Sequence, residues 1–420
     1  MAATDFGFRQ TEKVRKLLPE WSQGMWGVAT DFIKRGEVET IGERDYRVPF
    51  KTVRAGRAGK FDPNFGDMGR GSASKGDKMV ASFYPLRMNA ELPLLATQLS
   101  NDVIIGNVFK DTMKELIPNF KNFMDKIFHS NGTALLAQAT ATSIYSTTKT
   151  IYTCNNAQGV TRLSRGQYVN VYSTAFAATD LKSANTLYVD AIDYDAKTVR
   201  LSGIVPSVVA TDKICFEGVT GATPEGMKGL YYWNDYTTSG TTLGIDRALE
   251  PEIIANSVSA AGGLTHEEGM LLYHKILMKA GQYADGLIGL CGTNVQAEIY
   301  SQVLSVQMYD VGRTQAFVDR MPEFKGKRFF NFANIAHYID INQAQDRIDW
   351  IVPKTWGTAQ LAPMDFFQLP GSNQRFFHLT GGSGAPAAGV WFGLICEQDY
   401  YNTEPRSAGV IYAIPLRTGY

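Results

Sequence analysis

The chain lacks the surplus of charge that marks several binding classes. Its 420 residues carry 41 basic and 41 acidic side chains, so the formal net charge is zero. A neutral balance argues against a dedicated nucleic-acid or anionic-membrane binder, because such proteins carry a basic excess. It also means that net charge does not keep copies of the chain apart.

Cysteine is scarce, and long apolar runs are missing. The four cysteines are far apart, form no CxxC pair and are interpreted as reduced, mostly buried thiols in a reducing compartment: Cys154, Cys215, Cys291 and Cys396. The first ten residues, MAATDFGFRQ, contain no apolar signal core. The longest apolar stretch, 385–396, is interrupted by proline and glycine and is too short to span a membrane. We therefore expect a soluble protein made in a cytoplasm.

Motifs for catalysis, cofactors and metals are incomplete. His266-Glu267 opens HEEGMLLYH, but a zinc-binding HExxH helix needs a second histidine where Met270 stands. Thr265 and Glu268 instead match a capping box, which predicts the start of a helix. The glycines of 66–71 resemble a phosphate loop, yet no apolar strand leads into them and no amphipathic helix follows.

One cysteine could be combined with a histidine as nucleophile and base. Cys291 could be drawn with His274 or His337 in these roles, but it ends the apolar run GLIGLC. A buried inert thiol is the favoured interpretation. We expect that the protein is not an enzyme and has no catalytic residue, cofactor or metal site.

Residues 35–90 form the most informative segment. Apolar and polar side chains alternate in two runs, as in strands, with the apolar positions at Tyr46, Val48 and Phe50 and at Met79, Ala81 and Phe83. A glycine-rich stretch separates the runs. From Arg44 to Lys78 there are nine basic and four acidic residues, a surplus of five. The pattern predicts a long hairpin or flap that projects outward.

The flap contains few apolar side chains for its length. Ordering a backbone costs roughly 1–2 kcal/mol per residue, whereas full burial of a large apolar side chain gives about 1.5–3 kcal/mol. We therefore predict that the flap is mobile alone or is ordered by docking on a neighbour. The predicted contact residues are Arg47, Lys51, Arg54, Arg57, Lys60, Phe61, Phe65 and Arg70. A nucleic-acid arm is an open alternative, weakened by the interspersed acids.

A long helix is predicted next, followed by a module of short strands. Apolar residues recur at helical spacing from about residue 100 to Phe128, and Pro118 should kink or split this helix. Short β-type runs separated by turn residues over 146–218 suggest a small antiparallel barrel inserted as a module. Mixed helices and strands follow to the end of the chain.

The order of these elements resembles the major capsid protein of tailed bacteriophages, which has the Hong Kong 97 capsid fold. NDVIIGNVFKDTMKELIPNF is similar to the spine helix of that family. The segments around NTLYVDAIDYDAKTVRLSG and ATDKICFEG are similar to β-insertion modules in some members. GIDRALEPEIIANSVSAAGGLTHEEGMLLYHKI with GLIGLCGTN looks like the segment leading into the axial domain, and CEQDYYNTEPRSAGVIYAI resembles the closing strands.

The resemblance implies an α+β fold with peripheral and axial domains. The implied division is an N-terminal arm (1–34), an extended β-hairpin loop (35–90), the spine helix with the first part of the peripheral domain (91–145), an inserted β-barrel module (146–222), the axial domain (223–345) and closing strands (346–420).

The function implied is a shell subunit of a virion. Copies would assemble in the host cytoplasm into hexamers and pentamers of an icosahedral or prolate head enclosing double-stranded DNA without sequence specificity. Implied partners are a separate scaffolding protein, a portal and decoration proteins, and no membrane. The alternatives are another virion structural protein, of a tail or a decoration, and a nucleic-acid-binding protein that acts through the basic loop.

Overall fold

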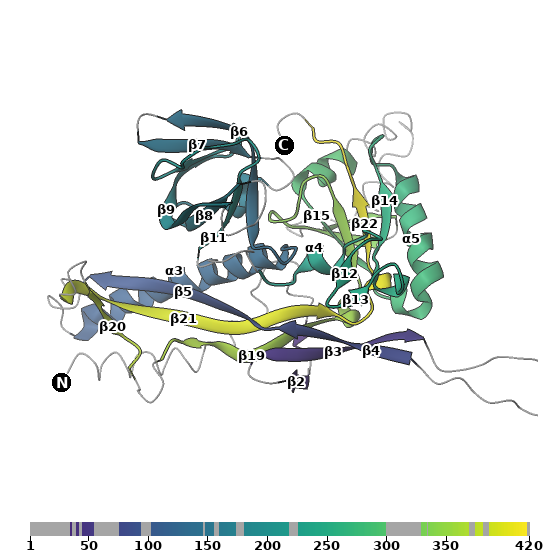
Figure 1. Cartoon of the computed structure of the whole chain (residues 1–420), viewed down its shortest axis with the longest axis horizontal. Coiled ribbons are helices and arrows are strands. Elements are labelled where there is room, and N and C mark those ends of the chain that lie inside the picture. Colours follow the sequence, from purple (N-terminus) through teal and green to yellow (C-terminus); the bar gives the residue numbers. More distant parts are fainter. Residues whose placement is uncertain are drawn as a thin grey trace, which may run out of the picture.

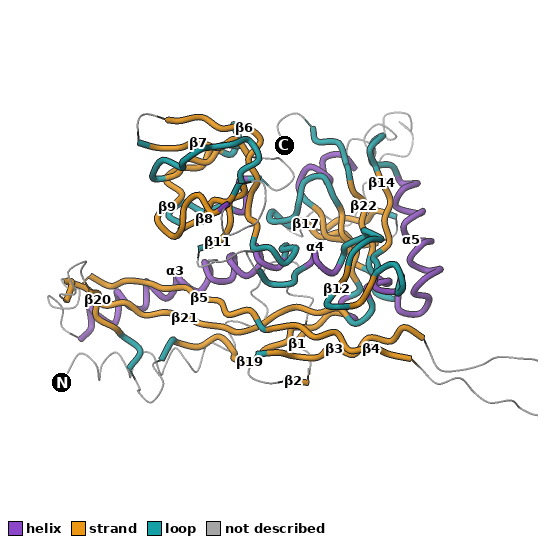
Figure 2. Tube along the Cα trace, viewed as in Figure 1, coloured by secondary structure: helices purple, strands orange, loops and turns teal. Residues whose placement is uncertain are grey.

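The structure is a computed structural model of the whole chain. It describes residues 34–35, 39–41, 44–53, 75–93, 102–145, 148–154, 159–173, 180–217, 226–299, 329–333, 335–368, 374–380 and 386–417. Strands are the commonest element of this part, and the long helices α3 and α5 lie among them (Figure 2). The mixed α+β class predicted from the sequence is confirmed.

A long, thin layer of strands forms one side of the molecule (Figure 1). Its sheet has the order β1-β19-β21-β20, and β5 also pairs with β21. The strands are β1 (Lys34–Arg35), β5 (Tyr84–Pro93), β19 (Trp356–Phe366), β20 (Phe377–Thr380) and β21 (Pro386–Asn402). Gly393 of β21 lies opposite Asn89 of β5, where a Cβ would come within 2.5 Å of the Asn89 Oδ1 atom. Glycine at this position therefore leaves room for the Asn89 side chain on the face of β21.

The predicted hairpin continues this layer. β2 (Glu39–Ile41), β3 (Asp45–Val53) and β4 (Lys75–Ser82) form a three-stranded antiparallel sheet. Tyr46 lies opposite Ala81, and Val48 opposite Met79. The predicted alternation is confirmed, because Tyr46, Val48, Phe50, Met79 and Ala81 are all buried.

The prediction that this segment cannot order itself is wrong for its base. The apolar face of β3 and β4 belongs to the main hydrophobic core of the same chain. The sequence argument compared the entropy cost of ordering the whole flap with the burial of the flap's own apolar side chains. It did not include the apolar side chains elsewhere in the chain against which the base of the flap packs. Residues 54–74, between the two strands, lie outside the described part.

The predicted spine helix is α3 (Asp102–Phe128), which runs lengthwise along the β5–β21 ribbon (Figure 1). Its buried face repeats every three or four residues, through Met113, Leu116, Ile117, Phe120, Met124, Ile127 and Phe128. Pro118 does not split the helix. Its ring is on the exposed face, where water can satisfy the backbone carbonyl that proline leaves unpaired.

The predicted barrel is present and closed. Its strand order is β10-β7-β6-β11-β8-β9. The strands are β6 (Leu135–Tyr145), β7 (Lys149–Cys154), β8 (Tyr168–Tyr172), β9 (Leu181–Asp193), β10 (Thr198–Leu201) and β11 (Lys213–Phe216). It begins with β6, which precedes the range 146–222 expected for the inserted module.

A second sheet of six strands has the order β14-β22-β18-β15-β17-β16. The strands are β14 (Asn256–Ser259), β15 (Ile288–Cys291), β16 (Phe329–Phe332), β17 (Ile335–Ile339), β18 (Ile348–Ile351) and β22 (Gly409–Tyr412). The helix α5 (His266–Ala280) packs on this sheet, and the capping box predicted for Thr265 and Glu268 is confirmed.

Smaller elements connect these units. They are α4 (Leu230–Trp233), β12 (Thr241–Thr242), β13 (Ile245–Asp246) and single 3-10 turns at Val160–Arg162, Pro251–Ile253, Gly281–Ala284, Pro353–Thr355 and Pro405–Ser407. None of the helices in the described ranges is long and apolar enough to cross a membrane.

The buried apolar side chains form two clusters. The larger cluster joins the hairpin base, α3, the barrel and the long sheet. The smaller cluster lies between α5 and the six-stranded sheet. The four cysteines are free and buried, as predicted, and burial raises the pKa of each thiol. A protonated thiol is a poor nucleophile, so Cys291 fits the predicted inert role.

Candidate self-assembly surface

A buried carboxylate on β21 anchors the base of the hairpin. The Tyr46 hydroxyl of β3 donates to the Asp399 Oδ2 atom at 3.1 Å. The backbone N–H groups of Lys228 and Tyr400 both donate to Asp399 Oδ1 at 2.9 Å, and the Lys228 Nζ atom lies 3.7 Å from Oδ2. Three segments far apart in sequence therefore converge on one side chain.

Aromatic contacts surround this anchor. The Tyr46 ring lies 4.8 Å from the Phe83 ring and 6.5 Å from the Tyr401 ring, measured between centroids. Such tilted pairs contribute roughly 0.5–1.5 kcal/mol each beyond the area that they bury. These contacts hold the base of the hairpin against β21.

Burial determines the charge state of the anchor. Loss of water raises the pKa of Asp399 to about 7, against the lowering influence of Lys228 and of the N–H donors. Burial, and then the nearby Asp399 charge, raises the pKa of Tyr46 well above its ordinary value. The tyrosine is therefore a permanent donor, while Asp399 changes charge near neutral pH.

The Asp399 shift predicts a pH-dependent stability. In the folded protein the Asp399 carboxyl group keeps its proton up to about pH 7, whereas in the unfolded chain it loses the proton near pH 4. The stabilisation that this difference gives to the folded state is therefore fully present below about pH 4 and is lost as pH rises to about 7. The maximal slope is about 1.4 kcal/mol per pH unit. Urea unfolding at pH 5, 6, 7 and 8 should show this fall in the wild type and a flatter profile in Asp399→Asn. Parallel profiles for the two proteins would contradict it.

The outer face of the hairpin base is polar and exposed. Arg47 is 37% exposed, and its guanidinium lies 3.8 Å from the Glu39 carboxylate of β2. Arg44, 65% exposed, lies 4.0 Å from Glu397 of β21. Val80, opposite Arg47 in the strand register, is a large apolar side chain exposed on this face. The face therefore combines basic groups with an exposed valine.

For most of the predicted contact residues the structure does not describe the side chain. Lys51 lies on β3 opposite Gly76, and its side chain is not described. The remaining ones lie outside the described residues: Arg54, Arg57, Lys60, Phe61, Phe65 and Arg70. Their role in a contact between subunits stays a prediction.

A second surface was missed by the sequence reasoning. The outer face of α5 exposes Leu271, Leu277 and Met278, the last of them by 79%. The opposite face of the helix buries Leu272 and Ile276 completely. A spacing of seven residues, as between Leu271 and Met278, places two side chains on one side of a helix. This apolar surface could therefore have been predicted from the sequence. Figure 1 shows α5 at the same end of the molecule as β3 and β4.

Comparison with known proteins gives structural matches only. No protein-family model matches the chain, and no curated protein matches it either. The capsid asymmetric unit of cyanophage A-1(L) is 10% identical, with a TM-score of 0.48, over 91% of this chain and 90% of that chain. The procapsid of satellite phage P4, which includes its size determination (Sid) protein, is 8% identical, with a TM-score of 0.41, over 97% and 100%.

A more distant match is the virus-like particle of Pyrococcus furiosus. It is 8% identical, with a TM-score of 0.34, over 96% of this chain and 98% of that chain. At these identities the likeness concerns the fold alone.

Proposed function

We propose that the chain is the shell subunit of a tailed-phage type of virion, a major capsid protein that assembles with many copies of itself. The observation that carries the proposal is the pairing of two surfaces at one end of the molecule. One is a hairpin fixed at its base by Asp399, and the other is an outer helix face with exposed Leu271 and Met278. Both suit contacts with neighbouring copies.

The geometry favours rings of subunits. A hairpin that lies on a neighbour makes a heterologous contact, because the two surfaces that meet are different. Heterologous contacts close into rings when the rotation between subunits allows it. Hexamers and pentamers are such rings, and together they close a head around double-stranded DNA. A scaffolding protein, a portal and decoration proteins belong to the same proposal.

Each contact between two subunits is weak, and the assembly is stable because every subunit makes several such contacts. An exposed ion pair that Arg47 or Arg44 makes with a neighbouring copy is worth about 0–1 kcal/mol. Burying an exposed Leu271 or Met278 against a neighbour adds roughly 1.5–3 kcal/mol each. Because every subunit is held by several neighbours at once, the contacts act multivalently. A reversible assembly that becomes stable only when closed is the expected result.

Removing the apolar side chains of α5 tests the proposal. The double variant Leu271→Ser with Met278→Ser should remain a folded monomer, because both side chains are exposed. The concentration at which particles form should rise about tenfold or more, since about 1.4 kcal/mol of lost contact energy is a factor of ten. Light scattering against protein concentration measures it.

The matched control is Tyr194→Ser, which removes an exposed apolar side chain from a barrel turn. We expect this variant to assemble at the concentration of the wild type. Equal assembly of the α5 double variant and the wild type would contradict a contact through this face.

A further inference from the structure

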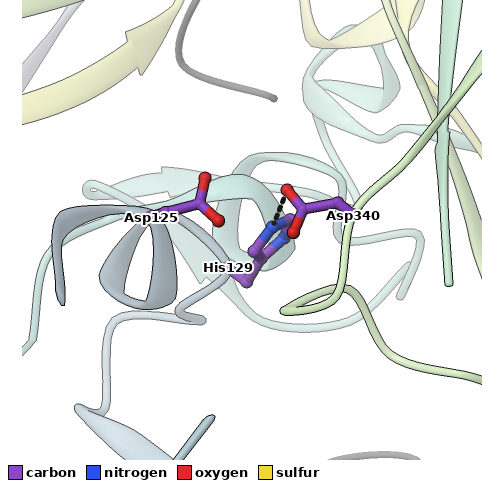
Figure 3. A group of neighbouring side chains, drawn as sticks. All are labelled: Asp125, His129 and Asp340. Carbon is purple, nitrogen blue, oxygen red and sulfur yellow. Dashed lines mark hydrogen bonds and ion pairs between the residues drawn. The ribbon is translucent and has the colours of Figure 1, made fainter. Parts of the chain in front are cut away.

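Three buried ionisable side chains meet where α3 approaches the six-stranded sheet. Asp125 and His129 lie one turn apart near the end of α3, and Asp340 follows β17. Their exposed fractions are 3%, 0% and 2%. Figure 3 shows the two carboxyl groups pointing toward each other, with the imidazole ring beside them. One potential ligand atom from each residue lies within 4.8 Å of the other two.

Hydrogen bonds satisfy only part of this cluster. The His129 Nε2 atom lies 3.0 Å from Asp340 Oδ2, and the backbone N–H of Asn342 donates to Asp340 Oδ1 at 2.9 Å. The Asn342 side-chain amide donates to Asp125 Oδ2 at 2.6 Å. The Asp125 and Asp340 carboxyl groups also share a hydrogen bond, while Asp125 Oδ1, His129 Nδ1 and Asn342 Oδ1 receive no N–H or O–H donor from another described residue. Buried polar atoms are almost always paired, so three orphans in one place indicate a missing group.

The missing group should carry positive charge. Two carboxyl groups are buried beside a single imidazole, and two basic side chains of this region hydrogen-bond to other groups. Lys126 Nζ donates to the Ser164 hydroxyl at 2.6 Å, and Arg162 Nε donates to the carbonyl of Asn342 at 2.9 Å. Buried carboxylates are normally paired with a cation or with a metal.

We propose that this cluster binds one divalent transition-metal cation, of the Mn²⁺ or Zn²⁺ type, through Asp125 and His129. Asp340 is a positioning residue: it accepts a hydrogen bond from the Nε2–H group of His129, and in that tautomer the Nδ1 lone pair is free for the metal. Asn342 Oδ1 offers a further oxygen. A ligand set of imidazole nitrogen with carboxylate and amide oxygen suits manganese or zinc better than calcium or magnesium.

The location suggests a structural role for the ion. Asp125 belongs to α3, which packs in the larger hydrophobic cluster, and His129 directly follows that helix. Asp340 follows a strand of the sheet that carries the smaller cluster. A cation held there joins the helix to the second sheet. Because the cluster is almost completely buried, the ion should exchange slowly once the chain has folded.

Metal content and titration of the full-length chain test the site. After prolonged dialysis against a chelator, Mn²⁺ is titrated with detection by electron paramagnetic resonance, and Zn²⁺ is titrated against a chromophoric competitor. We expect one equivalent of metal per chain and a higher unfolding temperature in its presence. Asp125→Asn should lose at least about tenfold in affinity, and Asp340→Asn should lose roughly 10–100-fold.

Asp190→Asn is the matched control. Asp190 is a barrel carboxylate bound by Lys149 at 2.8 Å and Arg200 at 2.6 Å, outside the cluster, and its removal should not change metal binding. If Asp125→Asn does not fold, His129→Gln takes its place, and the wild-type stoichiometry is decisive by itself. Failure of the wild type to bind a full equivalent, or binding that survives loss of Asp125 and His129, would overturn the proposal and leave a proton shared between the two carboxyl groups.

Discussion

Reversing the charge of Arg47 and Lys51 on β3 is expected to prevent particle formation while leaving the fold of the monomer intact. Arg47 is partly exposed, and its guanidinium pairs with the more exposed carboxylate of Glu39 in the same three-stranded sheet. Surface changes of this kind alter stability by only about ±0.5 kcal/mol. In an assembly the same change occurs at every contact, so a small loss per contact is multiplied over the shell.

The measurement is sedimentation velocity of Arg47→Glu with Lys51→Glu beside the wild type, with circular dichroism to confirm folding. Lys354→Glu serves as the control, because Lys354 pairs with Asp285 at 3.1 Å and both side chains are more than 70% exposed. We expect large particles for the wild type and the control and only small species for the hairpin variant. Normal particles from the hairpin variant would exclude this face from the subunit contacts.

The largest effect on the fold is expected from Phe128→Ala. Phe128 is fully buried at the end of α3, with ring centroids 4.9 Å from Tyr400 and 5.8 Å from Trp356. It joins the helix to both β21 and β19. Truncating a buried phenylalanine costs about 3–5 kcal/mol, from lost burial and from the cavity that remains.

Denaturant unfolding measures this loss as a change in the free energy of unfolding. Tyr194→Ala is the control, because its side chain is 59% exposed and its removal should change stability by less than about 0.5 kcal/mol. A loss below about 1 kcal/mol for Phe128→Ala would show that this ring is not a joint between the helix and the long sheet.

Local patterns made several elements predictable from the sequence. The alternation around Tyr46 and Met79 gave the right faces of β3 and β4, because side chains of a strand point to opposite sides in turn. Thr265 and Glu268 marked the start of α5, because the capping box is a contact within one turn. The helical spacing of the α3 residues identified the spine helix even though Pro118 lies within it.

Contacts between distant segments were not predictable in this way. β21 extends over 17 residues because β5 and β19 pair with it on both sides. Its glycines and polar residues look unfavourable until these partners are known. Asp399 and Tyr46 are 353 residues apart, and His129 and Asp340 are 211 apart, so neither pairing leaves a local signal.

The same limit explains the error about the flap. The apolar side chains of the flap cannot offset the entropy cost of ordering it. The sequence does not show that Tyr401 and Asp399 contact Tyr46 at its base, or that Lys228 pairs with Asp399. The hairpin is therefore best understood as an anchored arm rather than a free flap.

Electron microscopy of the purified chain, negatively stained and with or without a co-expressed scaffolding protein, tests the central claim most directly. A shell subunit should form closed particles of uniform size, or rings of five and six copies. A chain that stays monomeric by size-exclusion chromatography under all conditions, and shows no particle in the images, would contradict self-assembly as its function.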